Sequence, residues 1–116
     1  MSAIDLEEEL ISLCPILFQG KLISFECPPG WETIVRKLSL RLEEHARERN
    51  PKLRVVQVKS KFGGLRYYLF PHDEYAEALV NEAEDESFKT CEVCGQPGKE
   101  STRRSWTSTL CDQHDT

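Results

Sequence analysis

The chain has 116 residues and a formal net charge of −5, and 39% of its residues are hydrophobic and 30% charged. This length provides one domain, or one small domain with an appendage that a metal ion holds together. No apolar run approaches the roughly 18 residues of a membrane span, and the first residues lack the basic and apolar regions of a signal peptide. We therefore expect a cytoplasmic protein whose cysteines are reduced.

The first half of the sequence predicts two helices and a short strand. Leucines at helical spacing (Leu6, Leu10, Leu13 and Leu17) predict an opening helix over residues 5–17. Glycine and proline then interrupt the chain around an extended segment, residues 21–26, which predicts an edge strand. A second amphipathic helix is predicted from about Trp31 to Arg49, where Asn50-Pro51 stops it.

The next segment predicts a β-hairpin. Residues 53–60 and 65–70 are rich in Val, Tyr and Leu and flank a Gly-Gly pair, which predicts two strands that turn at residues 61–64. Alternation assigns Val56 and Val58 to one face of the first strand. The matching face of the second strand carries either Tyr67 and Leu69 or Tyr68 and Phe70.

A third predicted helix completes an α+β domain. It covers residues 73–88, with Asp73 as its N-cap and Tyr75, Leu79 and Ala83 on its inner face. The predicted fold is a small antiparallel sheet covered by two or three helices in residues 1–88. A small C-terminal module, residues 89–116, is packed on this domain or appended to it.

Two tight pairs of metal-ligating residues lie in the C-terminal module. Two residues separate Cys91 from Cys94, Gly95 follows them, and Cys111 and His114 repeat the same short spacing. A Cys-x-x-Cys pair folds into a turn that directs both sulfurs to one point, and glycine supplies the left-handed backbone at its exit. Three thiolates and one imidazole complete a tetrahedral set, so we predict one structural Zn²⁺ in a zinc-ribbon-like or treble-clef-like module.

The other candidate chemistry is weaker. Cys14 and Cys27 stand apart in apolar surroundings and are predicted to be small buried hydrophobes. The run His72-Asp73-Glu74 upstream of Cys91 resembles the His-x-Glu and Cys-x-x-Cys signature of zinc-dependent nucleobase deaminases. Thr90 stands where that signature has proline, and the deaminase arrangement leaves the second ligand pair without a role. We therefore expect no catalytic residues and no enzyme.

Charge is distributed unevenly, and it marks two candidate binding surfaces. Residues 51–70 contain five bases and no acid, with Lys59, Lys61, Phe62 and Arg66 around the predicted turn. Together with Arg103 and Arg104, these residues favour a nucleic-acid-binding accessory or regulator as an alternative function. The net charge of −5 opposes broad affinity for nucleic acid, and a structural turn with solubilising bases accounts for the same residues. The second surface is an acidic run on the third helix, a solvated face or a docking surface: Glu82, Glu84, Asp85 and Glu86.

Three sequence blocks together resemble a group of small uncharacterised proteins found in bacterial and phage genomes. They are Gly30-Trp31, the segment VQVKSKFGGLRYY at 56–68, and the tail with CEVCGQPG at 91–98, Trp106 and TLCDQH at 109–114. The resemblance implies a zinc-binding tail and residence on mobile elements, and it carries no catalytic assignment. By analogy with small acidic proteins of such origin, we expect a protein-binding module that inhibits a host defence complex, as anti-CRISPR proteins do, by masking or mimicry.

Overall fold

The computed structural model describes residues 3–102 and 106–115. Its helices are α1 (Ala3–Leu13), α2 (Pro15–Phe18), α3 (Glu32–Arg49) and α4 (Glu74–Ser87), and a 3₁₀ turn (Pro29–Trp31) precedes α3. Its strands are β1 (Ser24–Phe25), β2 (Arg54–Lys61), β3 (Gly64–Phe70), β4 (Lys99–Ser101) and β5 (Ser108–Leu110). The predicted α+β class is confirmed.

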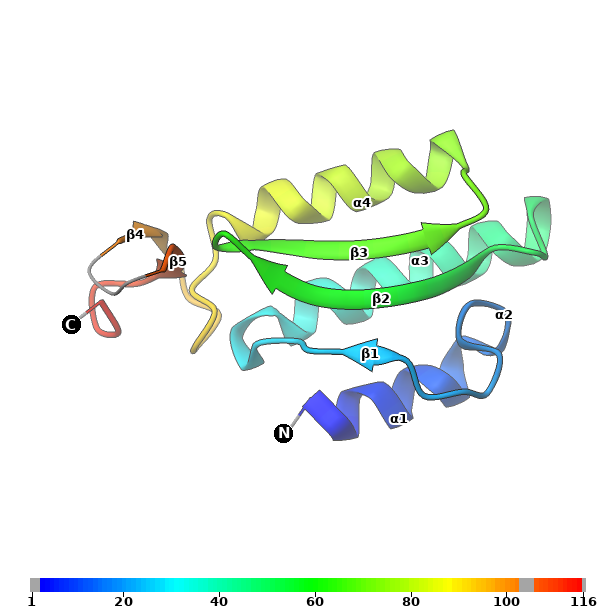
Figure 1. The fold of residues 1–116 in the computed structure, drawn as a ribbon, viewed down its shortest axis with the longest axis horizontal. Coiled ribbons are helices and arrows are strands. Elements are labelled where there is room, and N and C mark those ends of the chain that lie inside the picture. Colours follow the sequence, from blue (N-terminus) through cyan, green and yellow to red (C-terminus); the bar gives the residue numbers. More distant parts are fainter. Residues whose placement is uncertain (1–2, 103–105, 116) are drawn as a thin grey trace.

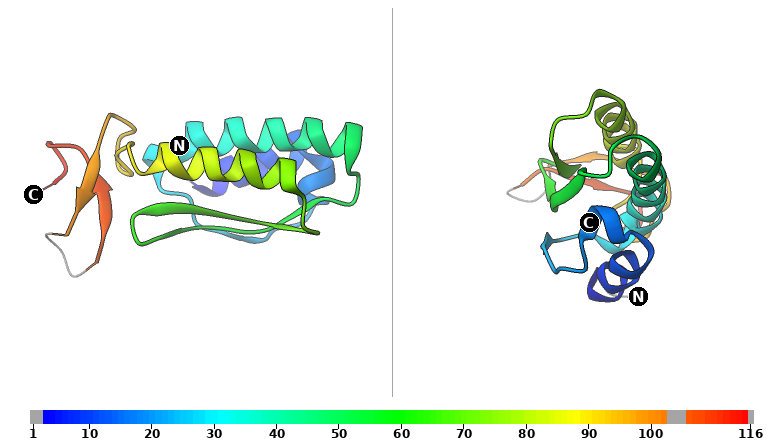
Figure 2. Two further views of the ribbon diagram at one scale, coloured as in Figure 1. Left: turned by 90° about the horizontal axis from the view of Figure 1, so that it is seen from above. Right: turned by 90° about the vertical axis from the view of Figure 1, so that its right-hand side faces the viewer.

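The main sheet has the strand order β1-β2-β3, and the helices lie on one side of it (Figures 1 and 2). The strands β2 and β3 are antiparallel, but β1 runs parallel to β2, with Ser24 opposite Gln57 and Phe25 opposite Val58. The sheet is therefore mixed, and the predicted antiparallel sheet was wrong. The cause is the helix α3, which connects β1 to β2 and carries the chain back to the end where β1 began, as a parallel pair requires.

One hydrophobic core joins the helices to the inner face of the sheet. Trp31, Phe18 and Leu42 are among its largest fully buried side chains. The buried positions of α3 recur at helical spacing, which confirms the second predicted helix. Cys14 and Cys27 also belong to the core, as predicted, and burial raises the pKa of both thiols to about 12.

The predicted opening helix is interrupted at Cys14, so the prediction of one helix over residues 5–17 was wrong. Cys14 has φ −124° and ψ 68°, and the chain resumes helical geometry at Pro15. Proline disfavours the helical conformation in the residue before it but is well accommodated in a first helical turn. The break leaves Leu13 48% exposed, whereas the other three leucines of the predicted stripe are buried.

The hairpin turns where the sequence predicted it. Its two central residues, Phe62 and Gly63, have φ values of 55° and 79°. Two positive φ values in a two-residue loop define a type I′ turn, whose twist matches that of the flanking strands. The paired residues on either side of the turn are Lys61 and Gly64.

A register shift in β2 changes which valine is buried. The pairing with β3 is irregular between Val55 and Gln57, so Val55 and Val58 face the core while Val56 is exposed. The prediction that Val56 shares the inner face with Val58 was wrong, because strict alternation assumes a ladder without a bulge. On β3 the inner face carries Tyr67, with Leu69 half-buried, which is the first of the two predicted alternatives.

The helix α4 begins as predicted, and two of its three predicted inner residues, Leu79 and Ala83, are buried. The Asp73 carboxylate accepts a hydrogen bond from the Ala76 N–H at 2.9 Å, which confirms the N-cap. The buried residues are Ala76, Leu79, Ala83 and Ser87. Tyr75 is 59% exposed, so its predicted inward position was wrong: the buried stripe starts one residue later.

The tail forms a second, two-stranded sheet at one end of the molecule (Figure 1). The strands β4 and β5 are antiparallel, with Lys99 opposite Leu110 and Ser101 opposite Ser108. Within the described part of the chain, no helix combines the length and the apolar character that a membrane span requires.

Candidate metal centre

The first ligand pair lies in a tight turn directly after α4. The Gly95 N–H donates to the Cys91 carbonyl at 2.9 Å, and the Cys91 N–H donates to the Gln96 carbonyl at 2.7 Å. Gly95 has φ +84°, a conformation that side chains disfavour. The turn therefore has the form that the Cys-x-x-Cys-Gly spacing predicted, and it directs both sulfurs to the same side.

The second pair follows β5. The N–H groups of His114 and Asp115 both donate to the Cys111 carbonyl, at 3.1 and 3.0 Å, and this turn folds His114 back beside Cys111. The antiparallel β4–β5 pair returns the chain to the first turn. Short local turns thus form each pair, and the hairpin brings the pairs together.

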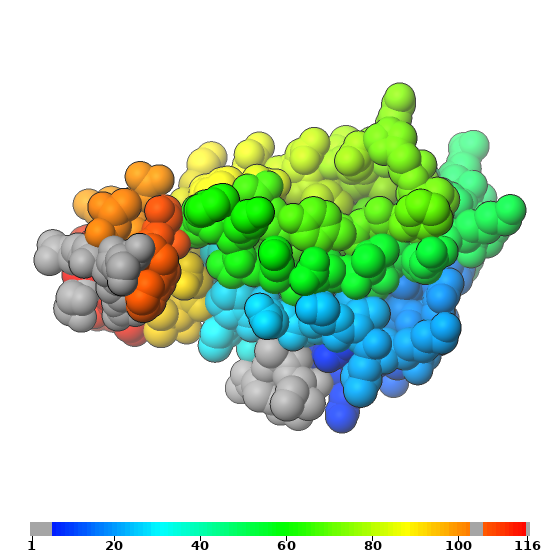
Figure 3. Space-filling view, viewed as in Figure 1, coloured from blue at the N-terminus to red at the C-terminus, as the bar shows by residue number. Residues whose placement is uncertain are grey.

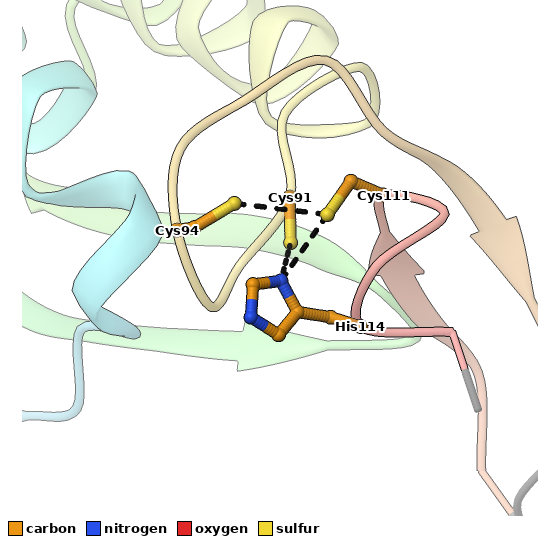
Figure 4. A group of neighbouring side chains, drawn as sticks. All are labelled: Cys91, Cys94, Cys111 and His114. Carbon is orange, nitrogen blue, oxygen red and sulfur yellow. Dashed lines mark hydrogen bonds between the residues drawn. The ribbon is translucent and has the colours of Figure 1, made fainter.

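The four predicted ligands converge on one point (Figure 4). The three sulfurs and a ring nitrogen of His114 all lie within 4.8 Å of one another. The Sγ atoms of Cys94 and Cys111 are 3.7 Å apart, and His114 Nδ1 is 3.6 Å from the Cys91 Sγ and 3.1 Å from the Cys111 Sγ. A tetrahedral zinc ion, with bonds of about 2.3 Å to sulfur and 2.0 Å to nitrogen, separates two sulfurs by about 3.8 Å and a sulfur from a nitrogen by about 3.5 Å. The group can therefore hold one metal ion.

Backbone hydrogen bonds prepare the first cysteine for ionisation. Burial alone would raise the pKa of Cys91, but the backbone N–H groups of Cys111, Cys94 and Val93 outweigh it and lower the pKa to about 6. The Gln96 N–H favours the Cys94 thiolate, yet burial and the neighbouring sulfurs of Cys111 and Cys91 raise the pKa of Cys94. This contrast is expected when thiols crowd together, because one thiolate opposes the formation of the next and a cation relieves that repulsion.

The tail contacts the α+β domain through backbone atoms next to the ligands. The Gly30 N–H donates to the Glu92 carbonyl at 2.8 Å, and the Trp31 Nε1 donates to the Thr90 carbonyl at 2.9 Å. A Cβ atom on Gly30 would overlap the Cys91 carbonyl oxygen. Gly30 therefore permits the close approach, which gives a physical reason for the Gly30-Trp31 pair.

A second contact joins the tail to the hairpin turn. The Thr109 hydroxyl donates to the Gly63 carbonyl at 2.7 Å. The Thr109 N–H donates to a Glu92 carboxylate oxygen at 3.1 Å, and the Glu92 N–H donates to the Thr109 carbonyl at 3.0 Å. Thr109 thus links the two ligand pairs to the tip of the hairpin.

The predicted binding-surface residues divide between two places. Lys59, Lys61 and Phe62 lie at or near the hairpin tip, with the Lys61 Nζ 5.5 Å from the centre of the Phe62 ring. The Arg66 Nη1 lies 3.6 Å from the Glu84 Oε2 in an ion pair, so the charges of these two predicted binding residues partly neutralise each other. Glu82, Asp85 and Glu86 are exposed on α4. The predicted nucleic-acid contacts Arg103 and Arg104 lie outside the described residues.

His72, which the deaminase alternative requires, lies far from the metal cluster. It precedes α4, whereas Cys91 follows it, and a helix of 14 residues is about 21 Å long. The His72 Nδ1 instead lies 3.3 Å from a Glu77 carboxylate oxygen. The structure therefore does not bring the two halves of the deaminase signature together.

Sequence patterns missed one polar cluster at the far end of the domain. The His45 Nε2 lies 2.8 Å from the Asp73 Oδ2, to which the Asn50 side chain also donates at 2.9 Å. The Tyr75 ring stacks on His45 with the ring centres 4.6 Å apart. His45 falls on the apolar side of its helix in the sequence, and the only available signal for the cluster was the N-cap assignment of Asp73.

Comparison with known proteins adds no further identification, because no family model, curated protein or solved structure matches the chain. The resemblance to small bacterial and phage proteins stays a prediction.

Proposed function

We propose that this chain is a non-enzymatic binding module whose tail is held by one structural zinc ion on Cys91, Cys94, Cys111 and His114. The observation that carries the proposal is the convergence of four ligand atoms within 4.8 Å. Three sulfurs and one nitrogen are a donor set that suits zinc. The order of Cys-x-x-Cys turn, hairpin and second ligand pair is that of a ribbon-like or treble-clef-like module.

Four protein ligands also support a structural role over a catalytic one. Catalytic zinc sites keep a coordination position for water or substrate, whereas structural sites fill all four positions with side chains. Cys91 is fully buried and His114 half-buried. The ion would crosslink the two ends of the tail, and we infer from this that the chain acts by binding and not by turnover.

The position of the cluster shows what such a crosslink would stabilise. Cys111 follows β5 directly, and Thr109 in that strand bonds to the hairpin turn. The first ligand pair is flanked by the contacts to Gly30 and Trp31. A bound ion would therefore hold β5 against the tip of the hairpin and make one continuous surface from two parts of the sequence.

The identity of the partner is a separate question. A host protein or complex as partner, and inhibition of a defence complex, stay predictions. The exposed acids of α4 (Glu82, Asp85 and Glu86) offer one surface for such a partner, and the basic hairpin tip offers another.

Elemental mass spectrometry on the purified chain tests the zinc site, with iron counted beside zinc. We expect one zinc per chain in the wild type and at least a tenfold loss of affinity in Cys94→Ser and His114→Ala, because each variant removes one of four bonds. The matched control is Cys27→Ala, a buried cysteine outside the cluster, which should keep one zinc.

Two results would contradict the proposal. Zinc retained with unchanged affinity in His114→Ala would mean that the fourth position is not a protein ligand. Zinc lost in His72→Ala would restore the deaminase arrangement and call for assays with nucleosides.

A further inference from the structure

The main sheet turns one of its faces to solvent, and that face carries aromatic and basic side chains. The helices pack on the other side (Figure 2), so β2 and β3 cross the front of the molecule in Figure 3. Tyr68 is 42% and Phe70 54% exposed there, and the Arg54 guanidinium lies 4.7 Å from the centre of the Phe70 ring. Large exposed aromatic rings in a small protein are typical of a binding surface.

A cleft lies at one end of this surface, between the hairpin turn and the tail. Four residues line its volume of about 420 Å³: Ser60, Phe62, Trp106 and Thr107. We call it the tip cleft. Its two rings come from segments far apart in the sequence, and Phe62 and Trp106 are 70% and 59% exposed.

Phe62 occupies a backbone conformation that does not suit it. With φ 55° it takes the first central position of a type I′ turn, where asparagine, aspartate and glycine are the preferred residues. A bulky residue in the left-handed region destabilises the fold, and the exposed ring recovers little of that cost by packing. Strained residues persist where they serve a function.

The charge beside the tip cleft is positive. Residues 51–70 contain five bases and no acid, and Lys61, next to the Phe62 ring, is exposed. Two exposed acids lie near this surface: Glu26 follows β1, and Glu100 lies on β4 opposite Thr109. Arg66 is paired with Glu84, so Lys59 and Lys61 are the bases that remain at the hairpin tip. The exposed acids Glu82, Asp85 and Glu86 belong to α4, on the helical side of the molecule, so the net charge of −5 does not describe the local charge at the hairpin tip.

We propose that the tip cleft binds single-stranded nucleic acid, with a base stacked on Phe62 and Trp106 and the flanking phosphates on Lys59 and Lys61. Single-stranded nucleic acid presents flat nucleobases next to phosphates, which fits a surface of exposed aromatic rings flanked by lysines. Any nucleobase can stack on such a ring, and the lysines neutralise the phosphates of the nucleic-acid backbone. The inference rests on the proposed zinc site, because a crosslinked tail would hold β5, and the residues before it, at the hairpin tip.

Fluorescence anisotropy with labelled oligonucleotides of about 12 nucleotides tests the proposal on the full, zinc-loaded chain. We expect oligothymidylate or oligouridylate to bind at about 50 mM salt and to be released steeply toward about 200 mM, with duplex DNA bound more weakly. The stronger of the two single strands identifies DNA or RNA as the ligand. Elemental analysis of the same sample reports the zinc content independently.

Phe62→Asn gives the sharpest result, because its two expected effects have opposite signs. Asparagine suits the turn, so the variant should unfold at a higher denaturant concentration than the wild type. Loss of one stacked ring should weaken oligonucleotide binding by about 5- to 150-fold. A purely structural Phe62 would give a less stable protein with unchanged binding, which would overturn the proposal.

Trp106→Ala and Lys61→Gln test the rest of the surface. Trp106→Ala should weaken binding over the same range as Phe62→Asn, and Lys61→Gln should lower the slope of log affinity against log salt by about 0.7. The control for Trp106→Ala is Tyr75→Ala on α4, because both side chains are 59% exposed. The control for Lys61→Gln is Lys37→Gln, an exposed lysine on α3. Both controls should bind as the wild type does.

Three outcomes would overturn the inference and leave the zinc site standing. The first is a chain with one zinc that binds neither oligonucleotide at low salt. The second is equal loss of binding in the tip-cleft variants and in their controls. The third is displacement of the oligonucleotide by a glutamate-tyrosine copolymer as readily as by unlabelled oligonucleotide, which would identify a protein-binding surface. A chain without zinc would instead refute the proposed function.

Discussion

The α+β domain and the C-terminal tail differ in what holds them together. Among the residues whose side chains the structure describes, the core cluster of 20 buried hydrophobic residues lies entirely between Leu6 and Ala83. In the described part of the tail, the buried hydrophobic residues are Cys91 and Leu110. One of these two, Cys91, is a proposed metal ligand, so the described part of the tail has almost no apolar core of its own.

This contrast shows two ways of ordering a short chain. Each fully buried leucine or phenylalanine of the core contributes about 1.5–3 kcal/mol by leaving water, and many such contributions offset the conformational entropy of folding. The tail lacks that area, but one structural zinc contributes on the order of 10 kcal/mol of apparent binding energy. A metal site is therefore a compact substitute for a core.

The two regions meet through hydrogen bonds and close backbone approach. Gly30, Trp31 and Gly63 of the domain contact Thr90, Glu92 and Thr109 of the tail. These contacts form a joint of polar and backbone atoms, and none of the six residues is a metal ligand of the proposed site. We therefore expect changes in either region to have separable effects on domain stability and on metal binding.

The largest expected effect comes from removing a core side chain. Leu42 is fully buried in α3, and Leu42→Ala should lower the free energy of unfolding by about 2–5 kcal/mol, because it leaves a cavity. Urea unfolding followed by far-UV circular dichroism measures this loss. The control is Leu40→Ala in the same helix, 42% exposed, with an expected loss of about 1 kcal/mol or less. Zinc content should stay at one per chain in both variants, and a parallel loss of zinc would show that the core determines the order of the tail.

The joint itself is tested by Gly30→Ala. The added methyl group would overlap the Cys91 carbonyl oxygen, so the tail should separate from the domain while all four ligands stay within it. We expect one zinc per chain, a domain that unfolds within about 2 kcal/mol of the wild type, and faster hydrogen exchange at residues 90–98. Gly20→Ala is the control: its Cβ would meet open space, so exchange at residues 90–98 should not change, although the positive φ of 67° at Gly20, unlike the backbone of Gly30, disfavours alanine. Unchanged exchange in Gly30→Ala would refute the docked position of the tail.

Local sequence signals predicted the tail and the long elements well. The ligands Cys91, Cys94, Cys111 and His114 follow from short spacings that constrain the chain wherever they occur. Likewise α3 follows from apolar periodicity, and the position of the hairpin turn at residues 61–64 follows from the Gly-Gly pair, although the sequence did not predict that Phe62 and Gly63 would be its central residues. These features depend on neighbouring residues, which a sequence displays directly.

Features that depend on residues far apart in the sequence could not be predicted from local patterns. The parallel pairing of β1 is set by where α3 returns the chain, and the bulge at Val55–Gln57 by how β2 fits its partner strand. Tyr75 shared the apolar periodicity of α4, but its ring packs on His45 at the rim of the domain. Periodicity predicts that a face exists, and tertiary contacts decide which residue begins it.

The smallest expected effect concerns charge at the end of the domain farthest from the metal. Burial alone would raise the pKa of Asp73, but hydrogen bonds from the Ala76 N–H, Asn50 and His45 outweigh burial and lower it to about 2. An aspartate in the unfolded chain has a pKa of about 3.9. Because the folded pKa is the lower one, ionised Asp73 stabilises the fold fully above about pH 4 and loses this contribution as the pH falls toward 2.

Asp73→Asn isolates that charge, because asparagine retains an N-cap oxygen while removing the ionisation. We expect unfolding at pH 7 to cost about 1 kcal/mol less in the variant than in the wild type, with the difference vanishing near pH 2. Urea titrations of metal-free protein at several pH values measure it without interference from the thiolates. If the difference in the free energy of unfolding between wild type and variant stays constant down to pH 2, the shape of the Asp73 side chain, and not its charge, determines its contribution to stability. A difference that follows the pH would show that this end of the domain is stabilised by its own electrostatics, independently of the proposed metal site at the other end.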